Sequence, residues 1–273
     1  MSETRRYRDA GNTAEVVRLE SQARSMSHLV AQEFQLLNLR PNLKVLDAGC
    51  GSGAITRMMA KVVYPETIVG MDIDPVFIEE ARKMATTQAI KNIRFEIGNI
   101  DSMDYENGAF DLTYSRFVLE HVNDPVWSVS EMKRVTKNEG YVAASDVEDD
   151  LMTGYPEVPM FWDLWKKYGA RTARKGANRH MGRELYSVFN KAGLSSISVH
   201  PMPFYATAAN PDVLKETVSV PVGLLQSARS GMIEEGLASD EDFDSMIEQI
   251  NQLTNDDGGF CMGCVFLAIG KVS

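Results

Sequence analysis

The chain has 273 residues, of which 44% are hydrophobic and 24% charged, and its formal net charge is −10. That length can bury one large core, and the excess of acidic residues disfavours nucleic acid or another polyanion as a partner. The sequence contains no apolar run near the roughly 18 residues of a membrane span and no signal peptide, and its three cysteines indicate reduced thiols, so we expect a cytoplasmic protein.

Residues 1–40 are predicted to form a helical cap. Asn12 and Glu15 have the spacing of a capping box, and Pro41 marks the end of the pattern. Apolar residues recur between them at helical spacing: Val16, Leu19, Ala23, Met26, Val30, Phe34 and Leu37. This period predicts one long amphipathic helix before the first strand.

The segment Val45–Ala54 predicts a buried strand, a glycine loop and the start of a helix. Glycines at 49, 51 and 53 allow a tight turn and let a ligand approach the backbone where a Cβ would collide. This arrangement is typical of a cofactor site of the nucleotide type.

The kind of cofactor has two interpretations. Gly49, Gly51 and Ala54 also fit the dinucleotide fingerprint, and Asp72 ends the next strand where it can accept from ribose hydroxyls in either case. Asp47 at the mouth of the loop, however, would repel a pyrophosphate and can meet an ammonium group. The third glycine, at 53, and the late start of the first strand also disfavour a dinucleotide. These features favour a cofactor with a ribose, a positive amino group and no phosphate.

Strands and helices alternate along the rest of the chain. Asp74 and Pro75 predict the start of a helix over 76–86. A buried final strand is predicted over 260–269. This alternation predicts an α/β protein whose parallel strands have right-handed crossovers and carry ligands at their carboxyl ends.

With these elements, residues 40–146 resemble the class I S-adenosylmethionine-dependent methyltransferases. The resemblance implies one domain over 1–273, with a doubly wound, Rossmann-like sheet of seven mostly parallel strands. It implies strands over 95–100, 110–116, 141–146 and 196–200, and helices from 124–125 to 138–140 and over 182–192. An N-terminal helix and helical insertions at 147–180 and 208–256 would form a lid over the acceptor pocket. Cofactor contacts are expected from Gln22, Asp47, Ala48, Gly49, Gly51, Asp72, Ile73, Asn99, Ile100, Ser115 and Arg116. Asn99 departs from the family's aspartate, but its amide can still pair with an adenine edge.

The segments 7–10, 18–23 and 116–122 are similar to those of quinone-biosynthesis-type methyltransferases, and among them to fungal S-methyltransferases acting on gliotoxin-type dithiols. This implies a small apolar acceptor, bound by Tyr7, Phe161, Trp162 and Trp165, and methylation that detoxifies a secondary metabolite. C- or O-methylation of a quinone or phenol is the alternative, and a cofactor-binding protein without catalysis is another. The candidate base is His121, whose other interpretation is structural.

Cys261 and Cys264 form a C-x-x-C motif within the predicted last strand. A spacing of three along a strand places the two side chains on opposite faces, unlike the turn that a redox pair occupies. We therefore expect neither redox chemistry nor a metal site.

Overall fold

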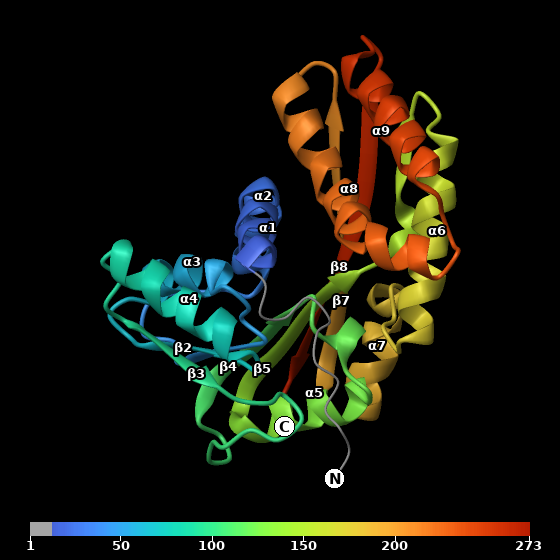
Figure 1. Ribbon diagram of the computed structural model, residues 1–273. Coiled ribbons are helices and arrows are strands. Elements are labelled where there is room, and N and C mark those ends of the chain that lie inside the picture. The colour runs from blue at the N-terminus through green and yellow to red at the C-terminus, as the bar shows by residue number, and fades with distance from the viewer. Residues whose placement is uncertain (1–12) are drawn as a thin grey trace. The chain divides into compact units, whose positions relative to one another are not determined.

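A computed structural model describes residues 13–273, so the predicted pocket residue Tyr7 lies outside the described residues. The chain divides into two compact units (Figure 1). The sheet unit contains the chain up to Val147, His180–Met202 and Val265–Ser273. The helical unit contains Glu148–Arg179 and Pro203–Cys264.

The sheet unit is built on five parallel strands in the order β3-β2-β1-β4-β5, followed by the antiparallel β8. The strands span β1 Val45–Ala48, β2 Ile68–Asp72, β3 Ile93–Ile97, β4 Phe110–Arg116, β5 Thr136–Val147, β7 Ser195–Thr207 and β8 Phe260–Lys271. β7 pairs with β8, and so does a short β6, Thr153–Tyr155. The described chain therefore has eight strands where seven are predicted, and the doubly wound, mostly parallel fold is confirmed.

Helices follow the parallel strands as expected for right-handed crossovers. They span α3 Ala54–Val63, α4 Pro75–Thr87, α5 Pro125–Val135 and α7 Met181–Lys191. Asp74 caps α4 by accepting from the Val76 amide at 2.7 Å, which confirms the predicted start. Met132 of α5 and Phe189 of α7 are fully buried in one cluster, whereas α4 packs against β3 in another. Burial on both faces explains why β1 is wholly buried.

The predicted long N-terminal helix is two helices, α1 Thr13–Ser25 and α2 Ser27–Leu36. The break follows Ser25, whose hydroxyl donates to the Gln22 carbonyl at 3.0 Å and shares that acceptor with the Met26 amide. A serine hydroxyl that competes for helix carbonyls weakens the local ladder. Asn12 of the predicted capping box lies outside the described residues, and Glu15 forms an ion pair with Arg18 at 2.5 Å.

Several other boundaries also differ from the predicted ones, among them the end of the third strand and the start of the fifth. The third strand ends at Ile97, because the Asn99 side-chain oxygen accepts from the Asp101 amide at 3.0 Å and forms a turn. The helix predicted to end at 138–140 ends at Val135, and the fifth strand begins already at Thr136, so residues 138–140 belong to a bulged part of that strand, where Glu139 has φ +66°.

The helical unit has its own apolar core. Its helices are α6 Pro159–Arg174, α8 Pro211–Glu234 and α9 Asp240–Asn255. Leu214 and Leu225 of α8 and Phe243 and Met246 of α9 are all 0% exposed. No helix within residues 13–273 combines the length and apolar character needed to cross a bilayer.

Candidate active site

The loop between β1 and α3 has the backbone conformation that its glycines predict. Gly49, Gly51 and Gly53 have φ values of +84°, +52° and +73°, which L side chains adopt rarely. The amides of Gly49 and Cys50 both donate to the Met71 carbonyl, at 2.7 and 3.0 Å. The loop is thereby held to β2 at the carboxyl edge of the sheet.

Protein side chains occupy the space next to these glycines. A Cβ at Gly49 would lie 2.4 Å from Val118, and one at Gly53 would lie 2.5 Å from the Phe95 ring. At Gly51 the nearest atom is Leu19 Cδ1 of α1, at 3.2 Å. The sequence argument assigns the space at Gly51 to a ligand alone, whereas the fold also places the N-terminal helix there.

Asp72 lies at the end of β2, beside this loop. One oxygen of its carboxylate accepts from the Gly51 amide at 2.8 Å and the other from the Asp74 amide at 2.9 Å. Burial raises the pKa of Asp72 above its ordinary value, and hydrogen bonds from the Asp74, Gly51 and Ile73 amides partly offset that rise. A carboxylate has about four lone-pair sites, so it can still accept from a hydroxyl of a ligand.

Asp47, on β1, is the most deeply buried acid of the loop region, with 2% of its surface exposed. The Thr56 hydroxyl donates to it at 2.6 Å. Burial raises the pKa of Asp47 to about 7, against the hydrogen bond from Thr56 and with a further contribution from Asp72. A buried carboxyl of this kind is stabilised in its charged form by a cationic ligand.

Two ionic contacts connect the N-terminal helices to the sheet unit, and sequence reasoning missed both. On α1, Glu20 accepts from the Ser52 hydroxyl at 2.6 Å and from the Arg57 guanidinium at 2.7 Å. On α2, Glu33 is 0% exposed and accepts from the Arg116 Nε at 3.3 Å. The sequence signal that could have identified Glu33 is the presence of an acidic residue beside the apolar Val30 and Phe34 of the helical pattern. The predicted Gln22 lies on α1 and accepts from Arg18 at 3.2 Å.

The remaining predicted cofactor residues follow the strand ends. Ala48 is fully buried at the end of β1, Ile73 is 36% exposed after Asp72, and Ile100 is 8% exposed. The side-chain oxygen of Asn99 accepts from the Asp101 amide in the turn. Its amide nitrogen has no acceptor within residues 13–273. Ser115 is buried on β4, and its hydroxyl has no partner in the described chain.

His121 ends a short 3-10 helix, Leu119–His121, that follows β4. Its side chain is 32% exposed, and its Nε2 lies 3.7 Å from the Glu120 carboxylate, which is itself 3% exposed. The carboxylate can therefore stabilise a protonated imidazole. The candidate base thus follows the same strand as Arg116.

The predicted pocket aromatics belong to the helical unit. Phe161 and Trp165 are 3% and 6% exposed, and their rings stack with centroids 5.8 Å apart. Trp162 packs edge-on against Phe161 at 4.8 Å. The three residues therefore form part of the core of this unit.

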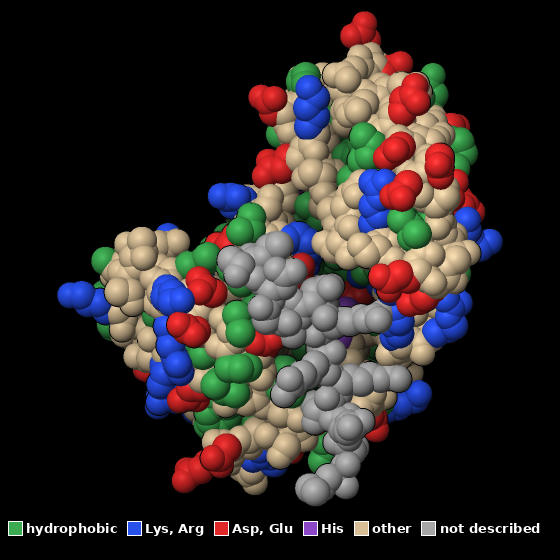
Figure 2. Space-filling view, in the orientation of Figure 1, with side chains coloured by type: hydrophobic (Ala, Val, Ile, Leu, Met, Phe, Trp, Pro, Cys, Tyr) green, Lys and Arg blue, Asp and Glu red, His purple; other side chains and the backbone are tan. Residues whose placement is uncertain are grey.

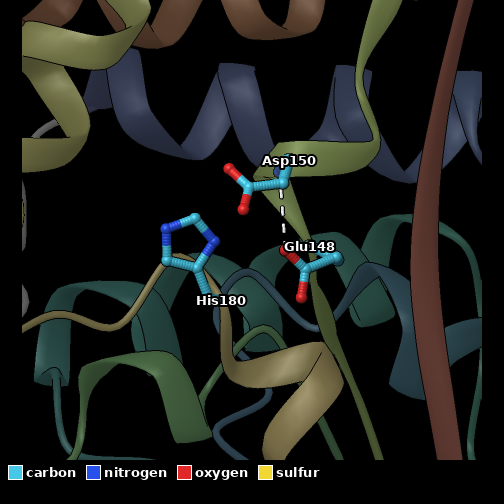
Figure 3. A group of neighbouring side chains, drawn as sticks. All are labelled: Glu148, Asp150 and His180. Atoms are coloured by element: carbon cyan, nitrogen blue, oxygen red, sulfur yellow. Dashed lines mark hydrogen bonds between the residues drawn. The ribbon is translucent and has the colours of Figure 1, made fainter.

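Acidic side chains mark two further places in the helical unit. The Glu148 carboxylate caps the short 3-10 helix Asp149–Leu151 by accepting from the Asp150 amide at 3.4 Å (Figure 3). His180, drawn in the same view, is the N-cap residue of α7 in the sheet unit. Acidic side chains also gather over α9, whose first turn contains Asp240, Glu241 and Asp242 (Figure 2).

The fold and the glycine loop define the class of protein. Residues 39–193 match the family described as Methyltransferase domain, which is more than half of the chain. The chain belongs to this family.

Individual relatives are more distant. An uncharacterized methyltransferase of Schizosaccharomyces pombe is 32% identical over 160 residues, covering 56% of this chain and 56% of that protein. The demethylmenaquinone methyltransferase of Bacillus cereus is 25% identical over 190 residues, covering 65% of this chain and 80% of that enzyme. Another relative, an uncharacterized transposon protein of Streptomyces fradiae, is covered over only 47% of its length, so the chain spans about half of some relatives.

Solved structures share the fold at low identity. The YcgJ protein of Bacillus subtilis has a TM-score of 0.59 at 16% identity, covering 90% of this chain and 98% of that one. The geranyl diphosphate C-methyltransferase of Streptomyces coelicolor has a TM-score of 0.56 at 16% identity, covering 90% of this chain and 79% of that one. These likenesses establish the methyltransferase architecture and leave the acceptor to be inferred.

Proposed function

We propose that this protein transfers a methyl group from S-adenosylmethionine to a small apolar acceptor, and that the donor lies along the glycine loop of the sheet unit. The observation that carries the proposal is a pair of carboxylates at the glycine loop, the buried Asp47 and the partly buried Asp72, whose oxygen accepts from the Gly51 amide. A cationic donor without phosphates suits such a site, whereas a dinucleotide would bring its pyrophosphate to Asp47.

Each part of the donor has a candidate partner. Asp72 would accept from the ribose hydroxyls, and Ile73 and Ile100 would contact the adenine, whose edge would meet Asn99. Asp47 would meet the ammonium group. When bound, the donor supplies a methyl group on a sulfonium, which is already activated toward nucleophiles. The protein's task is then mainly to position the acceptor, which can supply roughly 7–11 kcal/mol.

For the acceptor we propose a dithiol of the reduced epidithiodioxopiperazine type. Support comes from the resemblance of segments 18–23 and 116–122, and the first of these packs on the glycine loop through Leu19 and Glu20. A thiolate would attack the methyl carbon as the carbon–sulfonium bond breaks, leaving S-adenosylhomocysteine. A thiol has a pKa near 8.5, so it needs little help to lose its proton. Two such transfers would block redox cycling of the metabolite.

The second candidate is C- or O-methylation of a quinone or phenol, favoured by the similarity to demethylmenaquinone methyltransferase. Such an acceptor would need a general base. His121 is the candidate, and the Glu120 carboxylate at 3.7 Å would stabilise the imidazolium that forms.

The test is a mass measurement. The purified protein is incubated with S-adenosylmethionine and with matched dithiols, monothiols, phenols and quinols. We expect a gain of one and then two methyl groups on dithiols. Methylation of quinols alone would reject the dithiol, and no methylation together with tight donor binding would favour a binding protein without catalysis.

A further inference from the structure

Glu33 is a buried carboxylate that collects donors from two strands. Its Oε1 accepts from the Ser145 hydroxyl of β5 at 2.9 Å and from the Arg116 Nε of β4 at 3.3 Å. Its other oxygen accepts from the Tyr114 hydroxyl. The residue itself is 0% exposed on α2. Burying a charge this deeply is costly unless it is paired, so the arrangement calls for an explanation beyond helix packing.

Arg116 is held on several sides but uses only part of its guanidinium. Its side chain is 6% exposed, and Nε donates to Glu33 while the Phe117 ring lies 4.0 Å from Cζ. Nη2 contacts only the Met26 sulfur, at 3.6 Å, and Nη1 has no acceptor within residues 13–273. Sulfur is a weak acceptor. The two terminal nitrogens can therefore still bind a stronger ligand.

The backbone beside Arg116 is also constrained. Phe117 has φ +57°, a left-handed conformation that is uncommon for a bulky residue. Its amide donates to the Ser145 carbonyl at 2.8 Å, so the same β5 residue anchors both Glu33 and Phe117. Strained backbone that persists in this way is found where a side chain is held for a ligand.

The charges around Arg116 favour one kind of ligand. Arg116 and Asp47 are close enough to interact, as are Glu33 and Asp47. A guanidinium stays charged and binds carboxylates through a pair of parallel N–H donors. A ligand with one carboxylate and one ammonium group would then match Arg116 and Asp47 together, which is the amino-acid end of the donor.

We propose that Glu33 is a positioning residue, which holds Arg116 through Nε so that Nη1 and Nη2 bind the carboxylate of the methyl donor. This inference rests on the proposed donor site. The competing explanation is that Glu33 only pins α2 to the sheet, in which case its loss would weaken the binding of every ligand alike.

Two ligands separate these explanations: S-adenosylmethionine and its decarboxylated analogue, which keeps the ammonium, the sulfonium and the nucleoside. For Arg116→Met we expect the dissociation constant of S-adenosylmethionine to rise about ten- to a hundredfold, the range for a hydrogen bond to a charged group. For Glu33→Gln we expect a smaller rise, of about tenfold. For the analogue we expect less than a twofold change in either variant.

The matched controls are Tyr114→Phe and Ser145→Ala, which remove other donors to Glu33 and leave Arg116 unchanged. Both should keep the wild-type preference for the carboxylate-bearing donor. The double variant Glu33→Gln with Arg116→Met should bind that donor no more weakly than Arg116→Met alone. Thermal melting checks that each protein is folded, and Arg116→Lys, which keeps the charge but loses the paired donors, provides a second variant.

Parallel loss of both ligands in Glu33→Gln would overturn the proposal in favour of a structural role. A wild-type protein that does not prefer the carboxylate-bearing donor would overturn it as well. The donor site itself is tested separately by Asp72→Ala. If that change weakens both ligands, the site stands even when the role of Glu33 fails, and if it weakens neither, the proposed donor site fails.

Discussion

The sheet unit buries charged and hydroxyl side chains at the ends of β1, β4 and β5, whereas the buried side chains of the helical unit are mostly apolar. Asp47 and Ser145 belong to the first group, together with Glu33 of α2, which accepts from Ser145, whereas Leu225 and Phe243 belong to the second. Apolar burial stabilises a fold in proportion to the area removed from water, but a buried charge costs free energy unless it is paired. The difference agrees with the proposed donor site in the sheet unit, and it makes the apolar core of the helical unit a place where stability can be tested apart from that site.

The largest effect should follow from opening the helical core. Phe243→Ala is expected to lower the free energy of unfolding by about 3–5 kcal/mol, because it leaves a cavity where the ring was. The exposed Glu248 on the same helix provides the control, and Glu248→Ala should change stability by less than about 0.5 kcal/mol. Urea denaturation measures both. Below its melting temperature, the Phe243→Ala variant should bind S-adenosylmethionine as tightly as the wild type does. A weaker affinity would contradict the assignment of donor binding to the sheet unit alone.

Asp47→Asn should act in the opposite direction on stability. The pKa of Asp47 is raised to about 7 in the folded protein, so the folded state binds the proton more tightly than the unfolded chain does. Its contribution to stability is therefore fully present below about pH 4 and is lost as the pH rises to about 7. At pH 8 the variant should be more stable than the wild type by up to about 4 kcal/mol, with the gain shrinking toward pH 4.

The same Asp47→Asn change should weaken donor binding, because the ammonium group loses its charged partner. Urea denaturation at pH 5 and pH 8, with calorimetric titration of S-adenosylmethionine, checks both effects. Asp104→Asn, at an exposed aspartate, serves as the control. An identical pH slope in wild type and variant would show that Asp47 is not the titrating group.

Asp72→Ala should weaken S-adenosylmethionine binding by about 1.5–3 kcal/mol, since the ribose hydroxyls would lose a charged acceptor. Asp72→Asn is the matched variant and should lose less, because its amide oxygen can still accept. Isothermal titration calorimetry measures the difference. Unchanged affinity, or tighter binding of NADH than of S-adenosylmethionine by the wild type, would contradict the donor assignment.

The smallest effect is expected at His121. With a dithiol acceptor, His121→Ala should reduce turnover by much less than the roughly 100- to 10,000-fold that is typical of a lost general base. The reduction should become smaller as the pH rises toward the pKa of the thiol. With a quinol, the full loss should appear and persist. Profiles of rate against pH for both acceptors decide between them. A quinol turned over faster than every dithiol would replace the proposed acceptor and leave methyl transfer intact.

Local sequence pattern was sufficient for much of the sheet unit. β2 ends at the predicted Asp72, β4 has the bounds that the family resemblance implies, and Asp74 with Pro75 begins α4 as predicted. Such signals depend on side-chain period and capping chemistry within a few residues, and those are written in the chain itself. The same holds for the left-handed glycines at 49, 51 and 53 and for the position of Asp72 at a strand end.

Only the tertiary structure decided which polar groups meet. Glu33 and Tyr114 are 81 residues apart, and Glu33 and Ser145 are 112 apart, yet one carboxylate accepts from both hydroxyls. Leu19 over Gly51 and Glu20 on Arg57 depend in the same way on how α1 packs. Hydrophobic period tells which face of a helix is buried but not what lies opposite, because that is set by packing between distant elements. The sequence alone thus determined the fold and the conformation of the glycine loop. The packing of α1 and α2 on the sheet determined which charged side chains of these helices meet the loop and the strand ends.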